Sequence, residues 1–266
     1  MGYEFNVEKV TEGVINWIRE WFEENGKGCN AVIGISGGKD STIVAKLCVE
    51  ALGADRVIGV MMPCGVQKDI SDSIRVCEYL GIKNYTINIE GAVNATLKQM
   101  EDAGIEISNQ TIVNLPPRIR MSTLYAVSQS HNGRVSNNCN LSEDICGFST
   151  RFGDSVGDFS PLSNLTTVEI VQIGDYLGIP YDLVHKVPMD GLNVNENNEY
   201  ITDEDILGVR YSDIHTYARE PHKLMESNPE VYEAIREKER KNAFKLKPMP
   251  AYMPRLVDLY IARDTQ

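Results

Sequence analysis

The sequence has no long apolar run. In its 266 residues, no stretch approaches the ~20 consecutive apolar residues that a transmembrane helix needs. The first residues, Met1 to Phe5, also lack the basic segment and apolar core of a secretory signal peptide. We therefore expect a protein with no membrane partner and no signal for export.

Cysteine is present, but not in the spacing of a metal or redox site. The six cysteines include no Cys-x-x-Cys pair, so we expect neither a zinc site nor a redox dithiol. Several lie in apolar segments, where an unpaired cysteine behaves as a small hydrophobic residue. This pattern favours a reducing cytoplasm as the compartment.

The sequence also lacks a basic footprint for nucleic acid. Its formal net charge is −12, and its longest basic cluster, residues 236–247, is interleaved with glutamates. Proteins that bind nucleic acid usually need a basic surface, so we expect no nucleic-acid partner. An anionic small molecule remains compatible with this charge, because a local site needs only a few cations.

Apolar segments of strand length alternate with segments of helix period. Such alternation predicts a parallel sheet with right-handed crossovers, and 266 residues suffice for one large domain. We predict a single α/β domain over residues 1–266, a Rossmann-like parallel sheet flanked by helices. We expect strands at 31–35, 57–62, 85–89 and from 134. We expect helices at 7–21, 42–52, 70–80 and 168–177, after Pro116-Pro117, and from 229 to about 245. We also expect an irregular functional stretch at 137–165 and a polar loop at 193–200.

A glycine turn between the first internal strand and the next helix predicts an anion site. The run Ser36-Gly37-Gly38-Lys39-Asp40-Ser41 joins these two elements, at the carboxyl end of the strand. Free amide groups and the positive end of the helix dipole both face such a loop. The run is neither a Walker A loop nor a Gly-x-Gly-x-x-Gly turn, because it lacks the spacing of both.

A second block, from Asn140 to Asp154, holds a glutamate, a cation and an aspartate among small residues. Asp40 and Glu143 can supply oxygen ligands for a magnesium ion, and Arg151 can neutralise phosphate charge. Alone, this block is equally typical of a polar surface loop.

The two motifs together resemble a known enzyme family. The loop Ser36–Ser41 resembles the pyrophosphate-binding loop of the N-type ATP pyrophosphatases, which have the adenine nucleotide alpha hydrolase-like fold. The second block resembles the Asn-x-Ser-Glu…Gly-x-x-Thr-Lys-Tyr-Gly-Asp signature of the ammonia-dependent NAD synthetases. Further segments, including Arg118-Ile119-Arg120-Met121 and Leu177-Gly178-Ile179-Pro180, follow the family pattern in order from about residue 10 to about residue 250.

The resemblance implies roles for individual residues and a homodimer with the dinucleotide bound across its interface. Asp40 and Glu143 are expected to hold Mg²⁺ and, with Arg151, to be catalytic. The expected ATP contacts are Gly34, Ile35, Ser36, Gly37, Gly38, Lys39, Asp40, Ser41, Met61, Asn138, Thr167 and Met189. The expected contacts to deamido-NAD are Arg118, Arg151, Asp158, Phe244 and Lys245.

Several positions depart from the family pattern. Thr167 stands where a phosphate-contacting lysine is expected, and Lys39 is our candidate for replacing that cation. Arg151 replaces a lysine, which preserves charge but changes the donor geometry. The remaining departures are Asn138 for a threonine, Met189 for a threonine and Phe244 for a histidine.

The implied reaction is amidation of deamido-NAD to NAD. ATP adenylates the nicotinate carboxylate and releases pyrophosphate, and ammonia then displaces AMP; such chemistry depends on positioning and charge neutralisation. Free ammonia is the expected nitrogen source, because no cysteine has a glutaminase context. Two alternatives stay open: another N-type pyrophosphatase, such as a tRNA-thiolating or purine-amidating enzyme, and a non-catalytic nucleotide-binding homologue.

Overall fold

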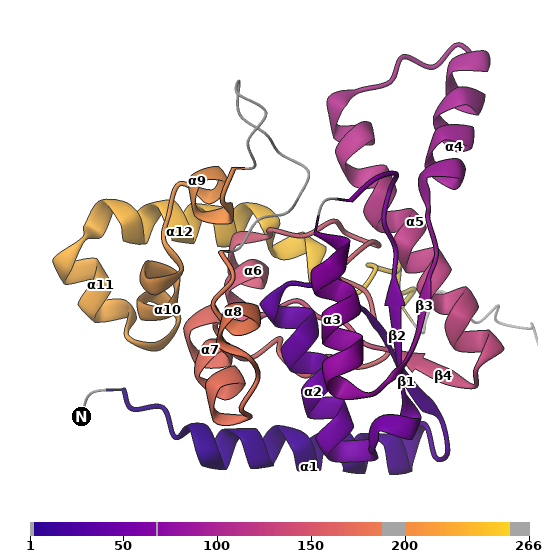
Figure 1. Ribbon diagram of the computed structural model, residues 1–266. Coiled ribbons are helices and arrows are strands. Elements are labelled where there is room, and N and C mark those ends of the chain that lie inside the picture. The colour runs from indigo at the N-terminus through magenta and orange to yellow at the C-terminus, as the bar shows by residue number, and fades with distance from the viewer. Residues whose placement is uncertain (1–2, 68, 188–200, 256–266) are drawn as a thin grey trace, which may run out of the picture.

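The computed structural model describes residues 3–67, 69–187 and 201–255. Within this part of the chain, four strands form one sheet in the order β3-β2-β1-β4, and every strand pair is parallel (Figure 1). The predicted parallel α/β fold is therefore confirmed. The strands are β1 (Asn30–Gly34), β2 (Val57–Met61), β3 (Lys83–Thr86) and β4 (Gly133–Val135).

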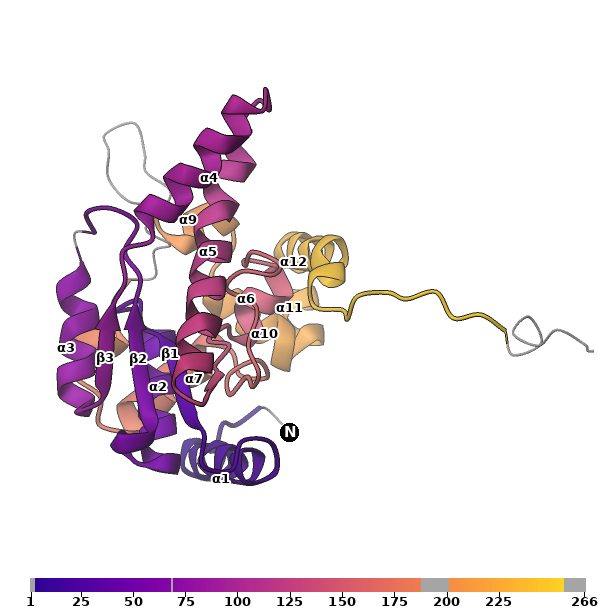
Figure 2. The same ribbon diagram turned by 90° about the vertical axis from the view of Figure 1, so that its right-hand side faces the viewer.

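The sheet lies between two groups of helices, because alternate side chains of each strand point to opposite faces. Ile33 of β1 packs with α1, α2, α3 and α7, whereas Val32 packs with α4 and α5 on the other face. Figure 2 shows α4 lying beside the upper part of the longer helix α5. These helices are α1 (Val7–Asn25), α2 (Lys39–Leu52), α3 (Ile70–Leu80), α4 (Glu90–Asp102), α5 (Asn109–Ser130) and α7 (Thr167–Tyr176), with the short η1 (Ala54–Arg56) and α8 (Tyr181–Val184) between them.

The first helix packs on the body of the domain. Its apolar face buries Ile18 and Phe22, and the helix lies against α2 and α7. Trp17, on the same helix, keeps 39% of its surface exposed. Sequence left open whether this helix belongs to the core or to an interface; its inner face belongs to the core.

A separate apolar cluster joins the later helices. Ile145, Leu207, Ile214 and Ile235 meet there, and Figure 1 shows α9 to α12 to the left of the sheet, with α7, α8 and α2 between them and the strands. The cluster positions the loop that follows α6 close to the end of α12. The helices are α6 (Leu141–Cys146), α9 (Asp203–Leu207), α10 (Tyr211–Arg219), α11 (Pro221–Ser227) and α12 (Pro229–Asn242), which continues into η2 (Ala243–Lys245).

Three sequence-based boundaries were wrong. The stretch 137–165 is not irregular throughout, because Asn140 caps α6 and Glu143 completes a capping box. Helix α5 does not follow Pro116-Pro117 but contains both, and the buried proline rings pack inside the domain. Strand β3 ends at Thr86, three residues earlier than predicted, although Ile87 still donates to the Met61 carbonyl. The predicted loop at 193–200 lies outside the described residues.

The structure bears on two further expectations, which concern membrane-spanning helices and the cysteines. In the described ranges, no helix is long and apolar enough to cross a membrane. All six cysteines lie within those ranges and are free thiols, five of them buried and Cys64 exposed. The prediction of small hydrophobic cysteines is therefore confirmed for five of the six.

Candidate active site

The Ser36–Ser41 loop lies between the end of β1 and the start of α2, as predicted. Gly37 has φ +78°, and a Cβ atom added there would lie 2.9 Å from Cβ of Asp72. Only glycine fits this backbone and this close approach to α3. The hydroxyl groups of Ser36 and Ser41 lie 3.1 Å apart, which fixes the two ends of the loop to each other.

The loop presents the start of α2 at the carboxyl edge of the sheet. Lys39 is the first residue of α2 and Asp40 is the second, so their amide groups have no carbonyl partner within the helix. No side chain caps this helix end, because its N-cap residue is Gly38. The arrangement is that of a phosphate site, in which backbone donors and the helix dipole attract an anion.

Asn140 joins the two predicted motifs across 100 residues of sequence. Its side-chain amide donates to Oδ1 of Asp40 over 2.9 Å, and its backbone amide donates to Oε2 of Glu143 over 3.1 Å. Oδ1 of Asn140 also accepts a hydrogen bond from the Thr167 hydroxyl at 3.2 Å. Asn140 and Thr167 are buried, so these bonds form a fixed support for the two carboxylates.

The electrostatics of this site couple the two carboxylates to one ammonium group. Burial, followed by the charge of Asp40, raises the pKa of Glu143 well above its usual range. Burial lowers the pKa of Lys39, but the charges of Asp40 and Glu143 outweigh this effect, so its pKa is raised. Lys39 therefore stays protonated, with Nζ 2.9 Å from Oδ2 of Asp40.

Asp40 and Glu143 fit a magnesium ion by their chemistry. Mg²⁺ prefers oxygen ligands, and proteins usually offer it one or two carboxylates beside waters and phosphate oxygens. In the part of the chain that the structure describes, no three His, Cys, Asp or Glu side chains are grouped to hold a metal. This donor set suits an ion that shares its coordination sphere with a nucleotide rather than a closed structural site.

A second cluster gathers the cations that the resemblance assigned to the dinucleotide. The Arg151 guanidinium lies 4.8 Å from the ring centre of Phe152 and 5.4 Å from that of Phe244. Arg118 donates to the Arg151 carbonyl at 3.4 Å. Lys245 donates to the Gly147 and Ser149 carbonyls at 2.6 and 3.1 Å. The structure thus brings together four of the five predicted contacts: Arg118, Arg151, Phe244 and Lys245.

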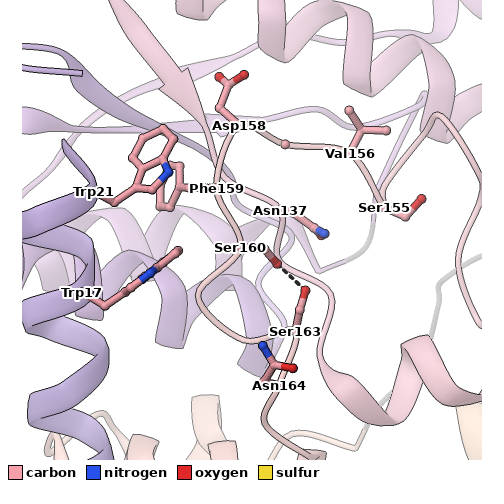
Figure 3. Close-up of a pocket in the computed structure, with 11 residues that line it drawn as sticks. Trp17, Trp21, Asn137, Ser155, Val156, Asp158, Phe159, Ser160, Ser163 and Asn164 are labelled. Carbon is pink, nitrogen blue, oxygen red and sulfur yellow. Dashed lines mark hydrogen bonds between the residues drawn. The ribbon is translucent and has the colours of Figure 1, made fainter. Parts of the chain in front are cut away.

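Asp158, the fifth predicted contact, lies beside a cavity of about 520 Å³ (Figure 3). Its Oδ2 accepts a hydrogen bond of 2.7 Å from the Val135 amide at the end of β4. In Figure 3, the indoles of Trp17 and Trp21 face the same cavity from α1. Sequence did not predict this cavity, because its walls come from α1 and from residues 137–164.

The remaining predicted ATP contacts include Ile35, Met61, Asn138 and Met189, which lie outside the Ser36–Ser41 loop in the sequence. The Asn138 side chain donates to the Gly34 carbonyl at 3.0 Å, at the end of β1. Ile35 and Met61 are buried at the ends of β1 and β2, with exposed fractions of only 3% and 2%. Their contact with ATP stays a prediction, and Met189 lies outside the described residues.

Comparison with known proteins agrees with this geometry. The NAD synthase family model matches residues 10–249. The chain belongs to the NAD synthase family. It is 38% identical over 204 residues to the NH(3)-dependent NAD(+) synthetase of Thermococcus sibiricus, covering 76% of each chain. The protein of that name from Carboxydothermus hydrogenoformans is 31% identical over 243 residues, covering 90% of this chain and 95% of the relative.

Solved structures of two family members superpose over most of the chain. The NMN synthetase from Francisella tularensis has a TM-score of 0.81 and 29% identity, covering 94% of this chain and 99% of its own. The NH3-dependent NAD synthetase from Campylobacter jejuni has a TM-score of 0.77 and 27% identity, covering 94% and 100%. The fold of these solved structures therefore extends over most of this chain.

Proposed function

We propose that this protein catalyses the ATP-dependent amidation of deamido-NAD to NAD with ammonia. One observation carries the proposal: Asn140 joins Asp40 of the nucleotide loop to Glu143 of the second block. The same block continues into Arg151, which lies in the cationic cluster with Lys245. This connection supports a triphosphate site and a site for an anionic second substrate at the two ends of the second block.

In the first step, an oxygen of the nicotinate carboxylate attacks the α-phosphorus of ATP. The bond from that phosphorus to the oxygen bridging to the β-phosphate breaks, and pyrophosphate leaves with the electron pair. The α2 amides stabilise the phosphate oxygens, while Arg118 and Arg151 orient the dinucleotide. Magnesium, held by Asp40 and Glu143, would supply charge neutralisation at the phosphates.

In the second step, ammonia attacks the carbonyl carbon of the acyl adenylate. The nitrogen loses a proton, the carbon–oxygen bond to AMP breaks, and the amide of NAD remains. Adenylation is required because a free carboxylate has no good leaving group. The names of the curated relatives, NH(3)-dependent NAD(+) synthetases, support ammonia itself as the nitrogen donor.

The cavity beside Asp158 bears on the choice between two substrates. A dinucleotide carries a second aromatic base, and Trp17 and Trp21, which line this cavity, offer flat apolar surfaces for stacking. The Francisella relative is named an NMN synthetase, so the mononucleotide is the natural competitor. We propose the dinucleotide as the preferred substrate, a homodimer as the working form and the cytoplasm as its compartment.

The test is product formation with purified protein, ATP and Mg²⁺. Ammonium should support NAD formation from deamido-NAD, glutamine should not, and nicotinate mononucleotide should react more slowly. Asp40→Asn and Glu143→Gln should each lose at least about a hundredfold in kcat. The matched surface changes Asp102→Asn and Glu237→Gln, both in exposed ion pairs, should leave kcat unchanged.

Failure has a distinct signature for each alternative. ATP consumption with another carboxylate or carbonyl, and not with either pyridine nucleotide, would indicate a different N-type pyrophosphatase. ATP binding without consumption of ATP in the presence of any acceptor would indicate a non-catalytic homologue. NAD formation only from glutamine would contradict the assigned nitrogen source.

A further inference from the structure

Lys39 is an unusual residue for its position. It is the first residue of α2, where the positive end of the helix dipole disfavours a cation, and only 5% of its surface is exposed. A buried ammonium group is costly unless it is paired. The structure must therefore supply compensating groups around the Lys39 side chain.

Those groups come from three separate segments. Oδ2 of Asp40 lies 2.9 Å from Nζ of Lys39, and the charges of Glu143 and Asp203 act on the same ammonium. The ring of Tyr211 lies beneath it, with its centre 5.5 Å from Nζ. Tyr211 is itself held by its hydroxyl group, which donates to Oδ2 of Asp203 at 3.3 Å. The ammonium thus contacts Asp40, one of the two carboxylates that the proposed function assigns to Mg²⁺, and the charge of the other, Glu143, also acts on it.

We propose that Lys39 is a positioning residue whose ammonium group is the internal counter-cation of Asp40 and Glu143, and that it competes with the divalent cation for them. The inference rests on the proposed function only in taking these two carboxylates as the metal ligands. Without the metal, the buried Lys39 ammonium offsets the negative charge at this site through its contact with Asp40. When the metal binds Asp40, the ion pair between Lys39 and Asp40 must break. Because breaking this pair costs free energy, Lys39 weakens the affinity of the site for the metal.

The test is Lys39→Met, which keeps the length of the side chain and removes its charge. Binding of Mn²⁺, followed by the loss of the free-ion paramagnetic resonance signal, gives a dissociation constant without any turnover. The variant should bind Mn²⁺ about tenfold more tightly than the wild type, because a repelling charge is gone. Its metal-free form should unfold at a lower temperature, and saturating Mg²⁺ should remove most of that difference.

Lys46→Met is the matched control on the same helix. Lys46 pairs with Glu50 one turn along a more exposed part of α2, so its removal should change neither Mn²⁺ affinity nor the effect of Mg²⁺ on unfolding. Lys39→Arg, which keeps the charge, should bind Mn²⁺ like the wild type. If Lys39→Met does not fold without metal, Lys39→Gln replaces it with the same expected result.

The possible outcomes separate this inference from the proposed function. Wild-type binding of Mn²⁺ together with equal or weaker binding by Lys39→Met overturns the counter-cation role and leaves the metal site intact. Absence of binding in the wild type and in every Lys39 variant overturns both the metal assignment and the inference. Tighter binding by Lys39→Met, abolished again by adding Glu143→Gln, supports the inference and places Glu143 at the ion.

Discussion

Replacing Asn140 with alanine should destabilise the protein far more than the loss of an ordinary helix cap. The side chain of Asn140 caps α6, donates to Asp40 at 2.9 Å and accepts from Thr167 at 3.2 Å. Loss of a cap costs about 1 kcal/mol. A buried polar group left without its partner adds about 1 kcal/mol or more, and here two groups are affected. We therefore expect a loss of about 3 kcal/mol from these terms.

Asn228 provides the internal comparison. It also caps a helix, α12, but through one bond of 3.3 Å to the Val231 amide, at a partly exposed site. Asn228→Ala should cost about 1 kcal/mol. Both variants would be unfolded with urea in metal-free buffer and followed by circular dichroism. Equal losses for Asn140→Ala and Asn228→Ala would refute the role of Asn140 as the support of the site.

Three further predictions concern the nucleotide loop, a buried ion pair and the cationic cluster. Gly37→Ala should weaken ATP binding at least about tenfold by calorimetry, because the φ of +78° is strained for alanine. Arg219→Met should cost about 3 kcal/mol in urea unfolding at pH 7, because fully buried Glu169 loses two bonds of 2.7 Å. Phe244→Ala should raise KM for deamido-NAD about threefold in steady-state assays by loosening Arg151.

Each of these changes has a control and a contrary result. Gly13→Ala, in an open helical position, should leave ATP binding unchanged; equal weakening would contradict the Gly37 prediction. Arg240→Met breaks only an exposed ion pair and should cost less than about 1 kcal/mol of unfolding free energy. Equal costs for Arg240→Met and Arg219→Met would contradict the Arg219 prediction. An unchanged KM for Phe244→Ala would show that Arg151 does not need this ring; Leu246→Ala is its neighbouring control.

The Arg219 prediction also has a pH dependence. Burial raises the pKa of Glu169, but the hydrogen bonds from Arg219 and Tyr3 outweigh it, so its pKa is lowered in the folded protein. Such a carboxylate stabilises the fold above its unfolded pKa of about 4.3, and the contribution is lost as pH falls through the lower folded value. The stability difference between wild type and Arg219→Met should therefore narrow below about pH 4.

Sequence predicted the elements whose pattern is local. Apolar runs ended by glycine or proline marked β1, β2 and α2, and the parallel-sheet rule placed the Ser36–Ser41 loop at the edge where ligands bind. Family resemblance brought Asp40 and Glu143 to one site, and Asn140 joins them in the structure. The predictions of strand segments and helix starts succeeded because both depend on residues that are neighbours in the sequence.

Features that depend on distant residues were not predictable. The capping box of Asn140 and Glu143 was not predicted, and the contact of Asn140 with Asp40 spans 100 residues of sequence. The surroundings of Lys39 combine α2 with Tyr211 of α10, which no local pattern links. Helix α5 passes through Pro116 and Pro117 because tertiary packing of the buried rings outweighs the intrinsic cost of proline within a helix.

The most direct measurement follows one oxygen atom through the reaction. Deamido-NAD labelled with ¹⁸O in its nicotinate carboxylate would be converted with ammonium and ATP, and the products analysed by mass spectrometry. Attack of the carboxylate on the α-phosphorus predicts one ¹⁸O atom in AMP for each NAD formed and none in pyrophosphate. Label in pyrophosphate or phosphate, or AMP without label beside newly formed NAD, would contradict adenylation at this site.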